Sequence, residues 1–225
     1  MRLPNTAHTS RSWRIHELAP DFRLEDVWAL PTPGARDDLL RLVRQFATDD
    51  PRELDAQGRY VGDGSHGIVS RVSRTIFALR WKLGELLGWD DPGSGVGRRV
   101  ATLRARLPVD LRDAPRGPDP ASVPMTSLYL TEDEWATEMA NRTVHSVMHI
   151  GWVPDGTGGY RGQMAVMVKP NGLFGRAYMA AIRPFRRRIV DPALIRMIGR
   201  DWRRQALTAG ECRGGRAARY DRRRS

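Results

Sequence analysis

The stretch "NGLFGRAYMAAIRPFRRRIVDPALIRMIGRDWRR", residues 171–204, decides the fold that we predict for this chain. Its apolar side chains recur at steps of three and four residues, which is typical of one long amphipathic helix. Such a helix would run on the order of 45 Å, longer than a small domain is wide. Pro184 and Pro192 each remove a backbone donor, so we expect a bend between residues 180 and 192.

The segments before this helix have the pattern of antiparallel strands. Residues 126–130, 134–141, 143–153 and 160–170 are rich in alternating apolar side chains. The turn "PDGTGG", residues 154–159, is typical of a hairpin. A strongly curved antiparallel sheet around the long C-terminal helix would bury the apolar stripe of that helix. The order of elements therefore predicts an α+β fold.

The spacing of apolar residues predicts the elements of the N-terminal half. It indicates a strand at 12–18 and helices at 21–30, 36–47 and 70–89. Residues 90–124 are loop-like, with a short segment that fits either a helix or a strand.

These elements suggest three parts. We expect a flexible leader at residues 1–10, a single domain at 11–204 and a basic, disordered tail at 205–225. A helical and loop-like insertion interrupts the domain at about 70–124.

Composition restricts the class of protein. With 40% apolar residues among 225, the chain can form a core of ordinary size. No apolar run approaches the roughly 20 residues that span a bilayer, and the N-terminus lacks the apolar segment of a signal peptide. The lone Cys212 has no partner for an internal disulfide, which agrees with a reducing cytosol. We therefore expect a cytoplasmic protein.

The net charge of +11 is concentrated at the C-terminal end. Residues 183–204 carry eight arginines against two aspartates, and residues 205–225 carry six arginines against two acidic residues. Such a segment could bind nucleic acid or an anionic membrane. The alternative is a solvated basic face on the long helix, which we favour for the helix itself.

Two segments also resemble a known family. "TVHSVMHIGWV" at 143–153 and "MAVMVKPNGLFGRAYMAAIRPFRRRIVDPAL" at 164–194 are similar to the corresponding segments of an uncharacterised bacterial family, a domain of unknown function. The similarity extends over most of residues 10–200. We place this family with the START-like, polyketide cyclase-like helix-grip proteins. The resemblance implies a curved antiparallel sheet around the C-terminal helix with an apolar cavity between them, and it supplies no catalytic residues.

The residues best suited to acid–base chemistry lie on the predicted strands. His145 and His149 share one strand face, about 13 Å apart at the rise of a strand, which is too far for one metal ion. Glu138, with Glu134, would place carboxylates on one face of the preceding strand. Either histidine or Glu138 could exchange a proton with a bound ligand. Solvent-facing or cavity-lining polar residues are the alternative interpretation, and we expect no metal ion and no cofactor.

Aromatic and methionine side chains are the candidates for contact with a ligand, because they suit an adaptable apolar cavity. The same residues suit an ordinary core equally well. The candidates are Tyr129, Trp135, Met148, Trp152, Met164 and Tyr178.

We therefore expect a protein that binds a small apolar or amphipathic molecule in a cavity between the sheet and the C-terminal helix. One alternative is an enzyme of the cyclase or dehydratase type that uses the same cavity. Another is a protein that binds nucleic acid or an anionic membrane through residues 183–225.

Overall fold

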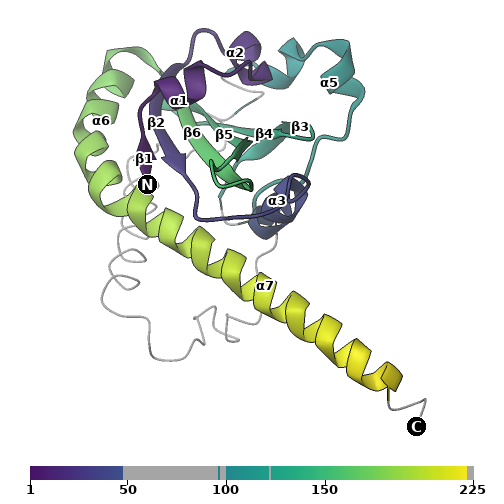
Figure 1. Ribbon diagram of the computed structural model, residues 1–225. Helices are drawn as coiled ribbons and strands as arrows, with labels where there is room; N and C mark the ends of the chain where they lie inside the picture. Colours follow the sequence, from purple (N-terminus) through teal and green to yellow (C-terminus); the bar gives the residue numbers. More distant parts are fainter. Residues whose placement is uncertain (48–95, 97–99, 122, 222–225) are drawn as a thin grey trace, which may run out of the picture.

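The computed structural model describes residues 1–47, 96, 100–121 and 123–221 (Figure 1). The predicted helix at 70–89 lies outside these residues. A six-stranded sheet with all neighbouring strands antiparallel forms the centre of the fold, and the strand order is β1-β2-β6-β5-β4-β3. The α+β class predicted from the order of elements is confirmed.

The predicted strands of the second half are confirmed. They are β3 (Thr126–Leu130), β4 (Glu134–Ala140), β5 (Val144–Pro154) and β6 (Tyr160–Pro170). The turn between β5 and β6 is closed by Asp155, whose carboxylate accepts hydrogen bonds from the backbone N–H groups of Thr157 and Gly159. β5 pairs with β6 in an unbroken register, so its odd-numbered and even-numbered side chains point to opposite faces of the sheet.

The N-terminal predictions need correction. Residues predicted as a strand form the short helix α2 (Arg14–Leu18), and residues predicted as a helix form the strand β2 (Arg23–Ala29). The pairing of β2 with β6 shifts register between Leu24 and Asp26. This bulge interrupts the alternation of apolar residues, so their spacing imitates that of a helix.

Residues 1–10 are not a flexible leader. β1 (Arg2–Leu3) pairs with the edge of β2, and α1 (Thr6–Thr9) places His8 in a fully buried position. The segment has little apolar character, and hydrogen bonds from its polar groups hold it in place.

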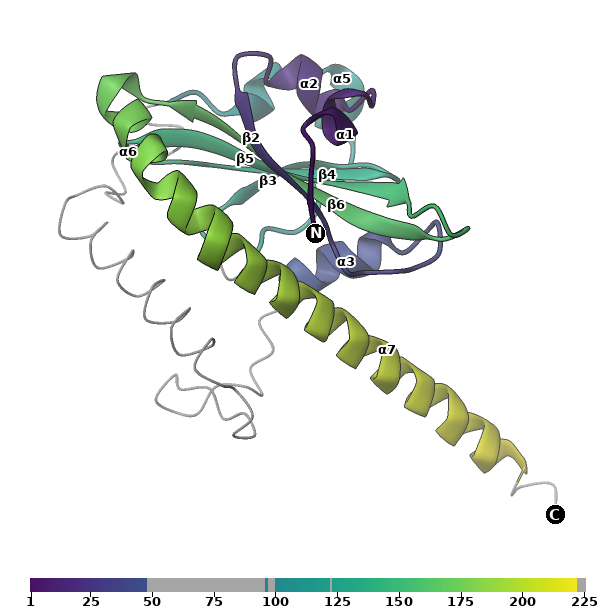
Figure 2. The same cartoon turned by 60° about the vertical axis from the view of Figure 1, so that its left-hand side comes forward.

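Helices cover both faces of the sheet (Figure 2). One face packs against α1, α2, the 3-10 turn η3 (Leu103–Arg106) and α5 (Val109–Asp113), around residues such as Ile15 and Val147. The other face packs against α3 (Leu39–Ala47), which confirms the predicted helix at 36–47, and against the C-terminal helix, around residues such as Ile150 and Trp202. We call these the N-terminal face and the C-terminal face.

The C-terminal helix bends where the sequence predicts a bend. It consists of α6 (Gly172–Phe185), the π-helical turn η4 (Arg186–Val190) and α7 (Asp191–Asp221), and it curves along the edge of the sheet before α7 runs straight (Figure 1). Wider π-helical turns are a recognised cause of kinks. α7 continues past residue 204, where we expected a disordered tail to begin.

The arginines at the bend pair with the sheet, which corrects their prediction as a solvated basic face. Arg186 and Arg187 donate to the two carboxylate oxygens of Asp26 at 2.5 and 2.7 Å, and Arg2 donates to the same carboxylate at 3.1 Å. Arg183 forms a two-point contact with Glu25. We call these six residues the Asp26 cluster.

A further carboxylate, Asp191, lies beside this cluster at the start of α7. Burial raises the pKa of Asp191 to about 6, and the neighbouring Asp26 carboxylate acts in the same direction. Arg186, 3.5 Å away, lowers this pKa without offsetting the other two effects. Buried charged groups therefore fix the bend to β2, and the raised pKa of Asp191 brings this carboxylate closer to its neutral form at pH 7.

Candidate functional site

Two buried histidine–glutamate pairs lie side by side on β4 and β5. The strands are antiparallel, with Ala136 opposite His149, so glutamates four residues apart on β4 meet histidines four residues apart on β5. Nε2 of His149 lies 2.8 Å from Glu134, and Nε2 of His145 lies 2.8 Å from Glu138. All four side chains are almost completely shielded from solvent.

The Glu138 pair holds η3 against the sheet. The Glu138 carboxylate accepts hydrogen bonds from the hydroxyl of Thr102 and, at 3.1 Å, from the backbone N–H of Leu103. Phe22 packs edge-on against the ring of His145, with ring centroids 4.9 Å apart. Both oxygens of this carboxylate accept hydrogen bonds, so the pair is a satisfied buried contact that attaches η3 to β4.

The Glu134 pair belongs to a longer network. Glu134 also accepts hydrogen bonds from the Tyr129 hydroxyl at 3.0 Å and from the backbone N–H of Arg14 at 2.9 Å. Nδ1 of His149 lies 3.1 Å from His8, and the other ring nitrogen of His8 lies 3.0 Å from His16. We call His16, His8, His149 and Glu134 the histidine chain.

Electrostatics sets the charge of this chain at neutral pH. Burial favours the neutral form of Glu134, but hydrogen bonds from His149, Arg14 and Tyr129 hold its pKa below the ordinary value. Burial, together with the two neighbouring imidazoles, lowers the pKa of His8 to about 3. Glu134 is therefore ionised at neutral pH, and His8 is neutral.

The predicted acid–base residues lie on the opposite face from the one that we expected. His145, His149 and Glu138 point to the N-terminal face, where they contact α1, η3 and the segment before β2. The space between the sheet and the C-terminal helix therefore does not contain them. An enzyme that uses these groups in that space is contradicted by the alternation of side chains along β4 and β5.

The predicted ligand-binding residues separate in the same way. Trp135, Met148, Trp152 and Met164 come together on the C-terminal face, where each is buried in the core beside α3 and α7. Tyr129 lies on the N-terminal face and binds Glu134. Tyr178, on α6, is partly buried against a third cluster around Val144, Val168 and Met179.

Sequence reasoning missed His8 and His16. Both are polar residues of the N-terminal segment, and the sequence predicts a flexible leader over residues 1–10, which include His8. The available signal was the presence of both residues within one short segment, together with two further histidines on β5. Nothing in the sequence shows that this segment crosses the sheet beside His149.

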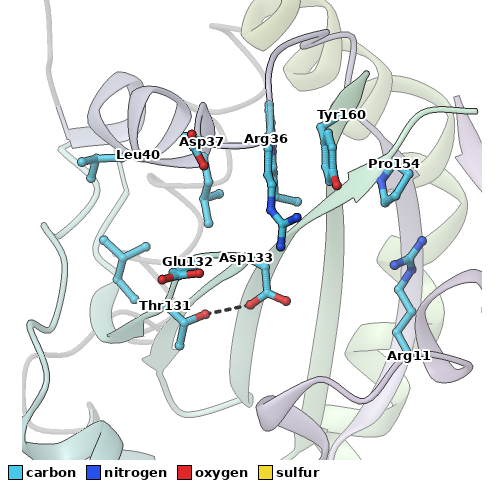
Figure 3. A pocket seen from close by; sticks show the side chains of 12 residues that line it. Arg11, Arg36, Asp37, Leu40, Thr131, Glu132, Asp133, Pro154 and Tyr160 are labelled. Carbon is cyan, nitrogen blue, oxygen red and sulfur yellow. Dashed lines mark hydrogen bonds between the residues drawn. The ribbon is translucent and has the colours of Figure 1, made fainter. Parts of the chain in front are cut away.

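A groove opens at the end of the sheet, between the β3–β4 turn, the β5–β6 hairpin and α3. Its volume is about 800 Å³. Figure 3 shows Arg36 and Asp133 entering this space from opposite walls, with Arg11 on a third side. Tyr160 stands beside Arg36, and Leu40 lies at the end of the space next to Asp37 (Figure 3). Among the described residues, the groove is lined by Arg11, Arg36, Asp37, Leu39, Leu40, Leu130, Thr131, Glu132, Asp133, Trp152, Pro154 and Tyr160.

Two further findings concern the described part of the chain. Within it, no group of three or more His, Cys, Asp or Glu residues is placed to hold a metal ion. No helix there is long and apolar enough to cross a membrane.

Comparison with protein families matches residues 18–193 to the family described as "Protein of unknown function (DUF2867)". The chain belongs to this family. A search of curated proteins gave no match. A search of solved structures gave none either. Family membership therefore covers β2 to β6 and the bend of the C-terminal helix, and it leaves the activity open.

Proposed function

We propose that this protein binds a small amphipathic molecule in the groove at the end of the sheet. The observation that supports this proposal is the composition of the groove, which combines apolar side chains with charged groups of both signs. Its volume of about 800 Å³ lies in the range of small-molecule sites. The sequence suggested the same class of ligand but placed it between the sheet and the C-terminal helix.

Packing favours the groove over the space between the sheet and the C-terminal helix as the ligand site. The described part of the sheet–α7 interface is occupied by buried side chains, among them Met148, Ile150, Ile198 and Trp202. The groove borders this core through Trp152, whose indole N–H donates to the carbonyl of Ala35 at 2.9 Å. A ligand there would rest on a rigid aromatic wall.

Charge indicates how such a ligand would lie. Arg36 is exposed and has no ion pair among the described residues, and Arg11 lies over the ring of Trp13 at 5.8 Å. An anionic head group would lie between these two guanidinium groups. The apolar part would then contact Leu40 and Tyr160.

We also propose that the fold is related to the helix-grip proteins. The support is the antiparallel sheet followed by one long C-terminal helix that crosses it. The described structure departs from the simple form of that fold, since α1, α2, η3 and α5 cover the second face of the sheet.

Binding of 8-anilinonaphthalene-1-sulfonate, an aromatic anion, tests the groove through fluorescence titration. In Leu40→Glu, an exposed groove residue gains a charge that repels the sulfonate, so we expect the Kd to rise about tenfold, equivalent to about 1.4 kcal/mol. The control is Val109→Glu on α5, where another exposed apolar residue lies away from the groove. Equal Kd values in both variants would contradict the assignment.

Native mass spectrometry identifies the natural ligand. Protein purified from its own source should retain a molecule whose mass is lost from Leu40→Glu and kept by Val109→Glu. Retention of the same molecule by both variants would place the ligand elsewhere.

A further inference from the structure

The hydrogen bonds of the histidine chain have only one consistent direction when Glu134 is ionised and all three imidazoles are neutral. A carboxylate can only accept, so Nε2 of His149 carries the hydrogen toward Glu134. Nδ1 of a neutral His149 then accepts, which requires Nε2 of His8 to donate. By the same argument, Nε2 of His16 donates to Nδ1 of His8. Each contact holds one hydrogen, and Nδ1 of His16 is left without one.

The chain can take up one further proton without losing a hydrogen bond. A proton that binds Nδ1 of His16 allows the hydrogen on Nε2 to pass to Nδ1 of His8. The same transfer repeats from His8 to His149, and from Nε2 of His149 to Glu134. The product has three neutral imidazoles with hydrogen on Nδ1 and a neutral carboxylic acid, and each contact again holds one hydrogen.

The ends of the chain differ in their access to water. His16 is partly exposed, whereas His8, His149 and Glu134 are buried. Trp13 lies over the middle of the chain, with its ring centroid 5.1 Å from that of His149. A proton therefore has a route from the surface at His16 to a carboxylate inside the protein.

The groups that face the chain come from each element packed against it. Tyr129 from β3 donates to Glu134, and the backbone N–H of Arg14 from α2 does the same. The Arg14 guanidinium and Asp133 are the further charges that act on Tyr129. On the α1 side, the amide of Gln163 from β6 donates to the carbonyl of Ala7.

We propose that His16, His8, His149 and Glu134 form a proton relay that carries one proton between the surface and Glu134. The relay has two states with the same set of hydrogen bonds, so the fold does not have to change when the proton enters. A second added proton would put two hydrogens into one contact and break the chain, which would detach α1 from the sheet.

Long-range proton–nitrogen NMR of the imidazole rings in the full chain tests the relay. At neutral pH, all three rings should carry hydrogen on Nε2 and none on Nδ1. On acidification, the Nδ1 atoms of His16, His8 and His149 should become protonated in one step with a common midpoint, while circular dichroism stays constant. Three separate midpoints, or hydrogen on Nδ1 at neutral pH, would overturn the proposal.

His8→Gln removes the middle of the relay, because an amide forms hydrogen bonds but does not pass a proton between two ring nitrogens. In this variant His16 should titrate alone, with burial still holding its pKa below the ordinary value, and His149 should keep hydrogen on Nε2 through that step. An unchanged common midpoint would refute the relay.

His16→Gln provides a second measurement. Because His16 is partly exposed and His8 is buried, this substitution should disturb the fold less than His8→Gln. His8 and His149 should still titrate together in it, because the remaining chain is continuous. Independent titration of these two rings in His16→Gln would also refute the relay.

Discussion

The Asp26 cluster predicts a large loss of stability when one charge is removed. The Asp26 side chain is 0% exposed, whereas its partners Arg2, Arg186 and Arg187 are 47%, 17% and 30% exposed. In Asp26→Asn, the shape is preserved, but three guanidinium groups lose their common counter-charge. Breaking a buried pair from one side costs about 3–5 kcal/mol. Because the arginines retain partial contact with water, we expect about 3 kcal/mol, the lower end of that range.

Urea unfolding at neutral pH, followed by circular dichroism, measures this loss. With an m-value of about 2–3 kcal/mol/M, the midpoint should fall by at least about 1 M. The contact that is weakened is the attachment of the bend, since the cluster fixes η4 and the end of α6 to β2.

Asp21→Asn is the matched control. Asp21 is 39% exposed and pairs with Lys169 and Arg106 at the surface, so its loss should cost less than about 1 kcal/mol. Added salt should reduce the effect of Asp21→Asn more than that of Asp26→Asn, because exposed pairs are screened. Equal midpoint shifts in the two variants would show that the Asp26 cluster does not hold the bend.

Three further predictions test other buried groups. The pKa of Asp191 is raised from 3.8 to about 6, so the stability that this group contributes to the wild type is present below pH 3.8 and is lost as pH rises through about 6. In urea unfolding, the stability of Asp191→Asn relative to the wild type should therefore increase by up to about 3 kcal/mol between pH 4 and 7. A difference that stays constant with pH would contradict this. Gly151→Ala places a Cβ 2.6 Å from the ring of Trp13, so its melting temperature should fall, by an equivalent of about 1–3 kcal/mol. Tyr129→Phe removes a hydrogen bond to the ionised Glu134 and should cost about 1.5–3 kcal/mol at pH 7, whereas unchanged stability would indicate a neutral Glu134.

The second half of the fold could be predicted because its patterns are local. β5 is rich in β-branched and other apolar residues, and a turn of Asp and Gly residues follows it. Pro184 and Pro192 flank the π-helical turn, so the position of the bend was also present in the sequence.

The N-terminal half resisted prediction for two physical reasons. A bulge between Leu24 and Asp26 changes the side-chain period of β2, and the resulting spacing matches a helix. α2, at residues 14–18, is too short to show a helical period. The apolar residues Ile15 and Leu18, with Trp13 just before the helix, instead fit the pattern of a strand.

The candidate site divides in the same way. His145, His149 and Glu138 could be chosen from the sequence because they are polar residues on predicted strands. Their face could not be chosen, since alternation separates two faces without stating which helices cover each. His8 and His16 required the fold itself, because they lie more than a hundred residues from His149 along the chain and meet it only when α1 packs on the sheet.

The sequence by itself determined the α+β class, the four consecutive strands, the long bent helix and the family, because each depends on local periodicity or on a continuous motif. Tertiary structure alone decided the partners of the charged groups. The arginines of the bend, expected to face solvent, bind Asp26 and Glu25, and the strand histidines, expected to face the C-terminal helix, meet glutamates and the N-terminal segment. Charges act through space, and the chain brings their partners close only when the sheet has formed.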